Sequence, residues 1–396
     1  MDQLAPVLIL LHRVGPYHHA RLQAAAKILP PPLLVLQTRP NSKEYPWSFS
    51  VEGAAYTLLS LSGALEPEED PPAPALRQQL NAVIDQYQPA VVVSVGWADS
   101  AYLLLLDLAQ QRNIPLVIVS DSCSQDSDRS PLKEWLKRQL LRGYSAALVA
   151  GSRSLDYLLE LGIEADVIHQ PWDVVDNGLI AQLAAQAELR LSTEEERPFL
   201  CVGRLIPEKN HAVLLKAYAQ YQLKGGAREL LLVGHGPLAE FIRAECAKLP
   251  RPSSVKLIPF LELEQLATIY GQAHALVLPS RKDTWGLVVN EAMAAGLPSI
   301  VSSACGCVDD LVEHGVTGWC FTSGDAEGLL KCLDQVDIQT LSERNRMTCK
   351  ARLRLTEYGL DSFAKGLKNA CIDAISRPKY SYRSRVLAYL LQAGFS

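Results

Sequence analysis

The chain has 396 residues, of which 48% are hydrophobic and 20% charged, and its formal net charge is −5. This length exceeds that of one ordinary domain and suits two. The charge excludes a dedicated basic nucleic-acid-binding protein, so we expect no nucleic-acid partner. The nine cysteines lack a paired C-x-x-C spacing, which favours reduced thiols in a cytoplasmic protein. The first apolar run, residues 6–11, is too short for a signal-peptide core or a membrane span.

Along the first half of the chain, short apolar runs alternate with segments of helical periodicity, as in parallel strands joined by crossover helices. The helices of this type are expected over residues 17–29, 100–111 and 131–141. The strands are expected over residues 6–11, 33–37, 90–95, 116–120, 146–150 and 166–169. Residues 1–175 are therefore predicted to form an N-terminal Rossmann-like domain. The alanine-rich and then acidic segment 177–197 is expected to contain the domain junction.

The second half repeats the pattern and is predicted to form another α/β, Rossmann-like domain over residues 196–376. Its expected strands cover residues 199–202, 230–233, 255–258, 275–278 and 299–301. From residue 325 onward the pattern is helical. Two such domains in series leave a cleft lined by the carboxyl ends of both sheets, which is where parallel sheets bind their ligands.

A glycine and two basic side chains follow the first strand of the second domain. Gly203 permits close backbone approach, Arg204 can form paired hydrogen bonds with phosphate oxygens, and Lys209 adds a point charge. An ordinary strand-to-helix loop with solvated charges is the alternative. The glycine pair Gly234 and Gly236, after the next strand, is explained equally well by turn geometry.

Residues 281–301 are the most informative stretch, because they place two carboxylates around a helix start. A polar loop with Asp283 opens at Gly286 into a helix that contains Glu291, and Gly296 ends that helix. A helix N-terminus offers unpaired N–H groups and a partial positive charge. The segment is therefore suited to bind an anion such as a diphosphate.

These motifs resemble those of retaining family-4 glycosyltransferases of the GT-B fold, the glycosyl transferases group 1, over most of the second half. The most specific part is an E-x7-E type motif, present here as Asp283 and Glu291. The resemblance implies that Glu291 holds the ribose hydroxyls of a nucleotide sugar and that Asp283 contacts the transferred sugar. It also implies that backbone N–H groups near Gly286 and Leu287 meet phosphate.

The same resemblance implies that Arg204 and Lys209, beside Gly203, neutralise the diphosphate leaving group. In the first domain it implies that Gly15 lies in a glycine loop against the diphosphate and the acceptor. Further donor contacts are implied for Pro259, Phe260 and Trp285. In the resembled fold the last helix, here within residues 379–396, packs back on the N-terminal, acceptor-side domain.

The sequence departs from the family pattern at two places. The first motif carboxylate is Asp283, where glutamate is commoner, and this shortens its reach by ~1.5 Å. Many relatives have a histidine near the sugar after the strand at 116–120, but Ser120 is followed here by Asp121. Asp121, or His12 at the end of the first strand, is the candidate for that contact. An ordinary loop or cap role is the alternative for each.

The resemblance implies a retaining, metal-independent hexosyltransferase of polysaccharide or glycolipid biosynthesis, without a cofactor. Its donor would be a nucleotide sugar, a UDP-sugar in preference to a GDP-sugar, and its acceptor a glycan or lipid-linked molecule. A catalytically inactive binding subunit and a nucleotide-sugar epimerase on the same fold are the alternatives. Residues 131–142 are amphipathic and basic. They suit either a peripheral contact with the inner membrane face or packing on the sheet.

Overall fold

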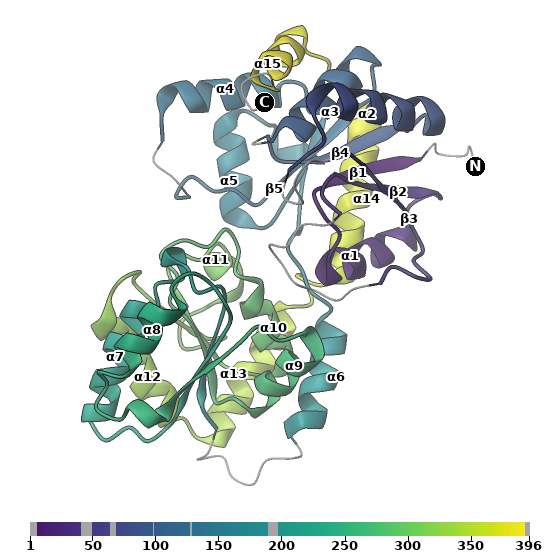
Figure 1. Ribbon diagram of the computed structural model, residues 1–396. Helices are drawn as coiled ribbons and strands as arrows, with labels where there is room; N and C mark the ends of the chain where they lie inside the picture. The colour runs from purple at the N-terminus through teal and green to yellow at the C-terminus, as the bar shows by residue number, and fades with distance from the viewer. Residues whose placement is uncertain are drawn as a thin grey trace. The chain divides into compact units, whose positions relative to one another are not determined.

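The computed structural model describes residues 6–40, 50–63, 69–97, 99–126, 129–188 and 197–392. The chain forms two compact units, which are considered separately (Figure 1). Unit 1 contains residues 1–174 and 360–396, and unit 2 contains residues 175–359. No helix in the described part of the chain has the length and apolarity needed to cross a membrane.

Unit 1 is built on a seven-stranded sheet in the order β3-β2-β1-β4-β5-β6-β7, in which every pairing is parallel. Because helices cover both faces, the central strands are mostly apolar and almost fully buried. The strands are β1 (Val7–Leu11), β2 (Leu33–Gln37), β3 (Thr57–Ser60), β4 (Val91–Val95), β5 (Leu116–Ser120), β6 (Ala146–Val149) and β7 (Ile168–His169).

Seven α-helices and one 3-10 turn surround this sheet within the described residues. The helix α14 packs against α1 and β6, and α15 packs against α3 and α4 (Figure 1). The helices are α1 (Pro16–Ala26), α2 (Ala73–Tyr87), α3 (Ser100–Gln111), α4 (Pro131–Leu141), α5 (Ser152–Leu161), α14 (Leu360–Ser376) and α15 (Tyr382–Gln392), and the turn is η1 (Ala165–Val167).

Unit 2 has a second parallel sheet of six strands, in the order β10-β9-β8-β11-β12-β13. Its strands are β8 (Phe199–Val202), β9 (Leu230–Val233), β10 (Val255–Ile258), β11 (Ala275–Leu278), β12 (Ser299–Ser302) and β13 (Trp319–Phe321). Its helices are α6 (Asn177–Glu188), α7 (His211–Leu223), α8 (Ala239–Cys246), α9 (Leu263–Gln272), α10 (Leu287–Ala295), α11 (Val308–Leu311), α12 (Ala326–Asp337) and α13 (Leu341–Arg354), with 3-10 turns η2 (Pro207–Lys209) and η3 (Pro252–Ser254).

The prediction of two parallel-sheet, Rossmann-like α/β units is confirmed. The sequence analysis missed β3 and β13, which are short edge strands, and α2 between β3 and β4. The units also divide the chain elsewhere than expected. The segment 177–188 is helix α6, which packs against α9 and α10 of unit 2, and residues 360–376 form α14 on unit 1. Both helices bury apolar faces that local composition alone did not assign to a unit.

Candidate active site

The loops after four neighbouring strands carry most of the predicted donor-binding residues of unit 2. The strands β10, β9, β8 and β11 are adjacent and parallel, so their carboxyl ends share one edge of the sheet. Six predicted site residues therefore lie on loops at this edge of the sheet. They are Gly203, Arg204, Lys209, Pro259, Phe260 and Asp283.

The glycine pair after β9 allows two of these loops to touch. A side-chain carbon on Gly234 would lie 1.9 Å from the carbonyl oxygen of Gly203, and one on Gly236 would lie 2.5 Å from that of Leu205. The backbone of Leu205 in turn donates to the carbonyl of His235 at 2.7 Å. The glycines thus fix the loop that carries Arg204, and turn geometry alone does not account for them.

Lys209 and Asp283 form an ion pair at this edge. Lys209 Nζ lies 2.6 Å from Asp283 Oδ2, and the Ser280 hydroxyl donates to the same oxygen at 3.3 Å. Burial alone would lower the pKa of Lys209, but the Asp283 carboxylate raises it above its usual value. Lys209 is therefore protonated at neutral pH. The sequence analysis assigned the two residues separate ligand contacts and did not foresee their pairing.

A second contact joins the same two loops. The Arg281 backbone donates to the carbonyl of Glu208 at 2.8 Å, and its guanidinium donates to Asn210 Oδ1 at 3.2 Å. Arg204 is half-buried in the first of these loops. Since both loops are anchored to each other, the cations and Asp283 have a defined spacing before any ligand binds.

The loop from Asp283 to Gly286 is held by the segment Cys305–Cys307, which the sequence analysis did not single out. The Gly306 backbone donates to the carbonyl of Asp283 at 2.9 Å, and that of Cys307 donates to the carbonyl of Trp285 at 2.9 Å. A side-chain carbon on Gly306 would lie 1.8 Å from the Thr284 carbonyl oxygen. The signal for this contact was the glycine between two cysteines directly after the β12 strand.

The helix α10 begins at this loop. Its N-cap Gly286 has φ of 101°, a conformation that favours glycine. The first amides of an α-helix have no acceptor within the helix and carry its partial positive charge. In α10 these are the amides of Leu287 and Val288, because the Val289 amide already donates to the carbonyl of Gly286 at 2.9 Å. The predicted phosphate-binding amides therefore lie at the start of a nine-residue helix, directly after the loop that holds Asp283.

Two residues predicted to contact the donor lie inside unit 2 instead. The Trp285 indole is 3% exposed, donates to Asn290 Oδ1 at 2.9 Å and stacks on Tyr358 with ring centroids 5.5 Å apart. Glu291 has no exposed surface, and the Tyr270 hydroxyl donates to its Oε2 at 2.6 Å. Both side chains are buried within unit 2, where α10 packs against α6 and α9, and their contact with a donor stays a prediction.

An exposed aromatic pair lies at the other end of the edge. His235, after β9, and Phe260, after β10, are in edge-to-face contact with centroids 5.9 Å apart. Phe260 is partly exposed and His235 is exposed. The pair offers a surface on which a flat base can stack. His235 was not among the predicted site residues, although it lies between the two glycines that were noted.

The corresponding edge of unit 1 gathers charged side chains around His12. His12 Nε2 lies 3.4 Å from Asp99 Oδ2, its Nδ1 lies 3.1 Å from Thr38 Oγ1, and Arg39 bonds both Asp70, at 2.9 Å, and Asp99. Burial, and then the positive charge of Arg39, lower the pKa of His12 to about 4. Burial, and then the neighbouring Asp70, raise the pKa of Asp99 to about 6. His12 is therefore neutral at neutral pH.

His12, Asp70 and Asp99 also have ligand atoms within 4.8 Å of one another, a spacing that a metal ion could bridge. The guanidinium of Arg39 already pairs with both carboxylates. Arg39 already neutralises the two carboxylates, as a bound metal ion would do. His12, Asp70 and Asp99 therefore fit a metal site poorly. No metal enters the function proposed below.

The other two predicted residues of unit 1 have separate surroundings. Gly15 is the N-cap of α1 with φ of −114°, and its amide donates to His18 Nδ1 at 3.4 Å. Asp121 follows β5, and its charge acts on the buried Arg21 of α1. Arg21 in turn pairs with Asp173 at 3.2 Å. Asp121 thus belongs to a buried charge network, whereas His12 belongs to the cluster with Asp99.

Residues 186–354 match the family model described as Glycosyl transferases group 1. The matched range includes the loops after β8 to β11, the Lys209–Asp283 pair and the start of α10. The match covers less than half of the chain, and it shows that this part of the chain is similar to the glycosyl transferases group 1. The resemblance to group 1 glycosyltransferases that Gly203, Arg204, Lys209 and the Asp283–Glu291 motif indicated is thereby confirmed, whereas the retaining family-4 subtype stays a prediction.

Curated relatives of this chain act on different molecules. Amylovoran biosynthesis glycosyltransferase AmsK from Erwinia amylovora is 31% identical over 152 residues, 37% of this chain and 37% of that protein. A D-inositol 3-phosphate glycosyltransferase from Mycolicibacterium vanbaalenii is 29% identical over 267 residues, 63% of this chain and 58% of that protein. The chain thus spans less than two thirds of the length of these relatives.

Solved structures resemble both units together. HepE from Anabaena, solved in complex with UDP-glucose, has a TM-score of 0.72 and 16% identity, over 92% of this chain and 98% of that one. Sucrose-phosphate synthase from Thermosynechococcus elongatus has a TM-score of 0.72 and 17% identity, over 92% of this chain and 97% of that one. At this identity the likeness concerns the fold, which is GT-B as predicted.

Proposed function

We propose that this chain is a retaining glycosyltransferase that moves a sugar from a UDP-sugar to a glycan or lipid-linked acceptor without a metal. The observation that carries the proposal is the edge of unit 2. There the Lys209–Asp283 pair, Arg204 and the start of α10 lie on loops at one end of the sheet, within the region similar to group 1. Such an edge suits a sugar diphosphate, which has an anionic end and a neutral, hydroxyl-rich end.

The leaving group sets the chemistry. In the transfer, the bond from the sugar C1 to the diphosphate oxygen breaks with its electron pair on that oxygen. Negative charge therefore grows on the diphosphate, and fixed cations and amides stabilise it. Lys209 and Arg204 supply the cations, and the amides at the start of α10 supply N–H donors. The acceptor oxygen bonds C1 on the same face and gives its proton to the departing phosphate.

Asp283 has two tasks in this proposal. Its carboxylate keeps Lys209 protonated and positioned. Its other oxygen accepts hydrogen bonds from hydroxyls of the transferred sugar. Because aspartate is one methylene shorter than glutamate, the sugar must lie closer to the loop or present its hydroxyls differently than in relatives with glutamate here.

The choice of UDP rests on the aromatic pair and on one solved neighbour. His235 and Phe260 offer a stacking surface that accepts any base, so the pair alone does not select uracil. HepE, of the same fold, was solved in complexes with UDP and with UDP-glucose. Glu291 is buried here and accepts a hydrogen bond from the Tyr270 hydroxyl. It would contact the ribose only if a ribose hydroxyl replaced Tyr270 as the donor. We keep that contact as a proposal.

A thermal-shift screen tests the donor. UDP, GDP, ADP and their common sugar conjugates are added with and without magnesium, since a ligand that binds the native state raises the melting temperature. We expect UDP and UDP-sugars to raise it independently of magnesium, and Lys209→Ala to abolish the shift. Lys216→Ala, an exposed lysine on α7 of the same unit, is the matched control and should behave as the unaltered protein.

Two other outcomes separate the alternatives. No shift with any nucleotide would favour a binding subunit that has lost its donor site. A shift with UDP-sugars, together with conversion of one free UDP-sugar into its epimer in the absence of an acceptor, would favour the epimerase. Nuclear magnetic resonance of the transferred linkage reports its anomeric configuration, and inversion would contradict the retaining mechanism.

A further inference from the structure

The helix α15 of unit 1 has one buried face and one exposed, apolar face. Its inner face, with Ser384, Ala388 and Gln392, is buried against α3 and α4. Its outer face carries four exposed apolar or aromatic side chains in three successive turns, namely Tyr382 (76% exposed), Val386 (37%), and the neighbours Tyr389 (57%) and Leu390 (61%). The inner face accounts for the packing of α15, so the outer stripe needs another explanation.

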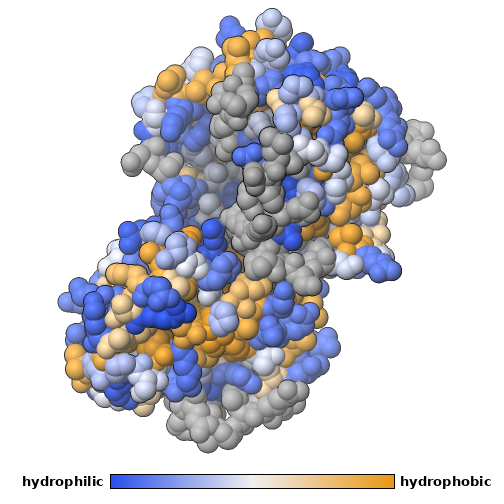
Figure 2. Space-filling model, viewed as in Figure 1, coloured by the Kyte–Doolittle hydropathy of each residue, from blue (hydrophilic) through white to orange (hydrophobic). Residues whose placement is uncertain are grey.

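The neighbouring helix α4 extends this apolar surface. Leu132 is 65% exposed and Trp135 is 54% exposed, and α15 packs directly against α4. Apolar residues gather at the top of the space-filling view, over these two helices (Figure 2). A tryptophan and tyrosines on such a surface are typical of the boundary between water and lipid, because each has an apolar ring with a polar group.

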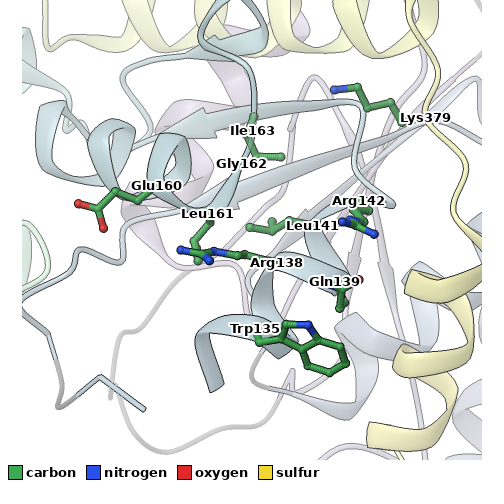
Figure 3. A pocket seen from close by; sticks show the side chains of 10 residues that line it. All are labelled: Trp135, Arg138, Gln139, Leu141, Arg142, Glu160, Leu161, Gly162, Ile163 and Lys379. Atoms are coloured by element: carbon green, nitrogen blue, oxygen red, sulfur yellow. The ribbon is translucent and has the colours of Figure 1, made fainter. Parts of the chain in front are cut away.

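A basic pocket lies beside the exposed tryptophan. It has a volume of about 700 Å³ and is formed by α4, the end of α5 and the residue Lys379 before α15 (Figure 3). Trp135 and Arg138 lie on α4, and Arg142 is its C-cap residue with helical backbone angles, so the spacing of three and then four residues places all three on one face. The pocket combines this indole with three cations, and Glu160 is its one acidic lining residue.

The charges of the pocket are incompletely compensated. Lys379 pairs with Glu164 at 3.1 Å, and Glu160 pairs with Arg129 at 2.6 Å. Within the described residues, by contrast, Arg138 and Arg142 have no ion pair. Residues 129–142 contain five basic side chains and one acidic one, and residues 377–392 contain four basic side chains and no acidic one. Five of these nine basic side chains, in Arg129, Lys137, Arg377, Lys379 and Arg385, form ion pairs with acidic residues. Arg138 and Arg142 therefore stand out as the unpaired cations of the pocket within the part of the chain that the structure describes.

We propose that this face of unit 1 binds the surface of a membrane that contains anionic phospholipids. The occupant follows from the charge and the shape together. Arg138 and Arg142 offer planar guanidinium groups that bind phosphate oxygens of a lipid headgroup in the pocket. Leu132, Trp135 and the outer stripe of α15 enter the boundary between headgroups and acyl chains. A soluble acidic protein would match the cations but would leave the apolar stripe without a function.

This contact needs no catalysis, so it is tested without a donor. The full chain is mixed with vesicles of phosphatidylcholine alone and of phosphatidylcholine with phosphatidylglycerol, and the bound fraction is measured by sedimentation. We expect binding to the anionic vesicles only, and weakening by added salt. Replacing both Arg138 and Arg142 by alanine should weaken binding by roughly 10- to 30-fold, on the basis of about fivefold for each cation at an anionic surface.

The matched control removes two other positive charges from the same unit. Lys365 and Lys368 are exposed on α14, and the double alanine variant has the same net charge as the arginine variant. It should bind anionic vesicles like the unaltered protein. Equal loss in both variants would show attraction by net charge alone and would overturn the proposal.

Tryptophan fluorescence tests the insertion itself. Anionic vesicles should shift the emission to shorter wavelength, and Trp135→Phe should remove that shift while leaving the fold intact. Glycerol phosphate in place of vesicles distinguishes a soluble phosphate ligand from a membrane. If it shifts the emission as strongly as vesicles, or if vesicles shift the emission of Trp135→Phe unchanged, this face is not a membrane-binding surface.

Discussion

The carboxyl edges of the two sheets have the same parallel construction but opposite charge balances. In unit 2, Lys209 neutralises Asp283, and Arg204 and the start of α10 add positive potential. In unit 1, Asp70 and Asp99 share a single guanidinium. The sheet therefore determines where a ligand edge lies, whereas the loops determine which ligand it suits. The diphosphate of the proposed donor is assigned to the edge of unit 2 because the cations and the start of α10 lie there.

The two edges also respond differently to pH. The pKa of Lys209 is raised, so this lysine keeps its charge through neutral pH. At the edge of unit 1, the pKa of Asp99 is about 6 and that of His12 about 4. Both unit 1 groups change charge in mildly acidic solution, where the unit 2 cation does not. Amino-acid substitutions and changes of pH can therefore separate what each edge contributes to UDP binding, sugar transfer and stability.

The largest effect should come from removing a cation of unit 2. Lys209→Ala or Arg204→Ala should raise the barrier to transfer on the order of 2–4 kcal/mol, as the loss of one oxyanion donor does. The reason is that the negative charge on the diphosphate loses a fixed partner while it forms. The measurement is kcat/KM for sugar transfer. Arg39→Lys at the other edge should leave the affinity for UDP nearly unchanged.

Lys216→Ala serves again as the control, since it removes an exposed lysine of unit 2 away from the edge. A decrease in kcat/KM of less than about threefold in both cation variants would remove the phosphate assignment. Equal losses of UDP affinity in Lys209→Ala and Arg39→Lys would remove the distinction between the two edges.

An intermediate effect should follow from Gly306→Ala. The added carbon would lie 1.8 Å from the Thr284 carbonyl oxygen, so the loop that carries Asp283 must shift. We expect a loss of about 1–3 kcal/mol in stability, as overpacking produces, together with weaker UDP binding. Both are measured in one thermal-shift series. Gly178→Ala, whose added carbon would be 3.5 Å from Asp176, should change neither. If Gly306→Ala melted normally and bound UDP normally, the loop would not depend on this contact.

Periodicity predicted most of the fold, because its long apolar strands are buried on both faces. Strands such as Leu33–Gln37 and Leu230–Val233 have the bounds expected from sequence. The short strand β13 (Trp319–Phe321) was missed, since three residues give no periodic signal. The placement of α6 and α14 depends on which sheet or helix buries their apolar faces. That information lies in contacts between distant segments, such as those of α14 with β6.

The sequence predicted which residues belong to the candidate site, but it did not predict which of them contact one another. The sequence indicated Lys209 and Asp283, which are 74 positions apart, yet only the fold brings them to 2.6 Å. It also indicated Glu291, but the helix face that carries this residue is covered by α6 and α9. Gly306 was missed because it is needed only to leave room for the carbonyl of Thr284. These residues are distant in sequence, so no local pattern indicates their contact.

The smallest predicted effect is a change in how the stability of unit 1 depends on pH. The pKa of Asp99 is raised to about 6, so its ionisation costs stability as the pH rises through that value. The pKa of His12 is lowered to about 4 from 6.5, so its protonation costs stability as the pH falls between those values. Between about pH 4 and 6 the two contributions have opposite signs. They therefore make the stability of unit 1 depend less on pH.

Asp99→Asn removes one of the opposing contributions and leaves the other. The melting temperature of the variant should therefore fall more steeply than that of the unaltered protein as the pH decreases from about 6.5 to about 4. Asp85→Asn, at a largely exposed aspartate on α2 that pairs only with Arg112, is the matched control and should keep the flat profile. A variant profile parallel to that of the unaltered protein would mean that Asp99 is ionised throughout the window. The edge of unit 1 would then hold two permanent carboxylates, and only the net charge would distinguish it from the edge of unit 2.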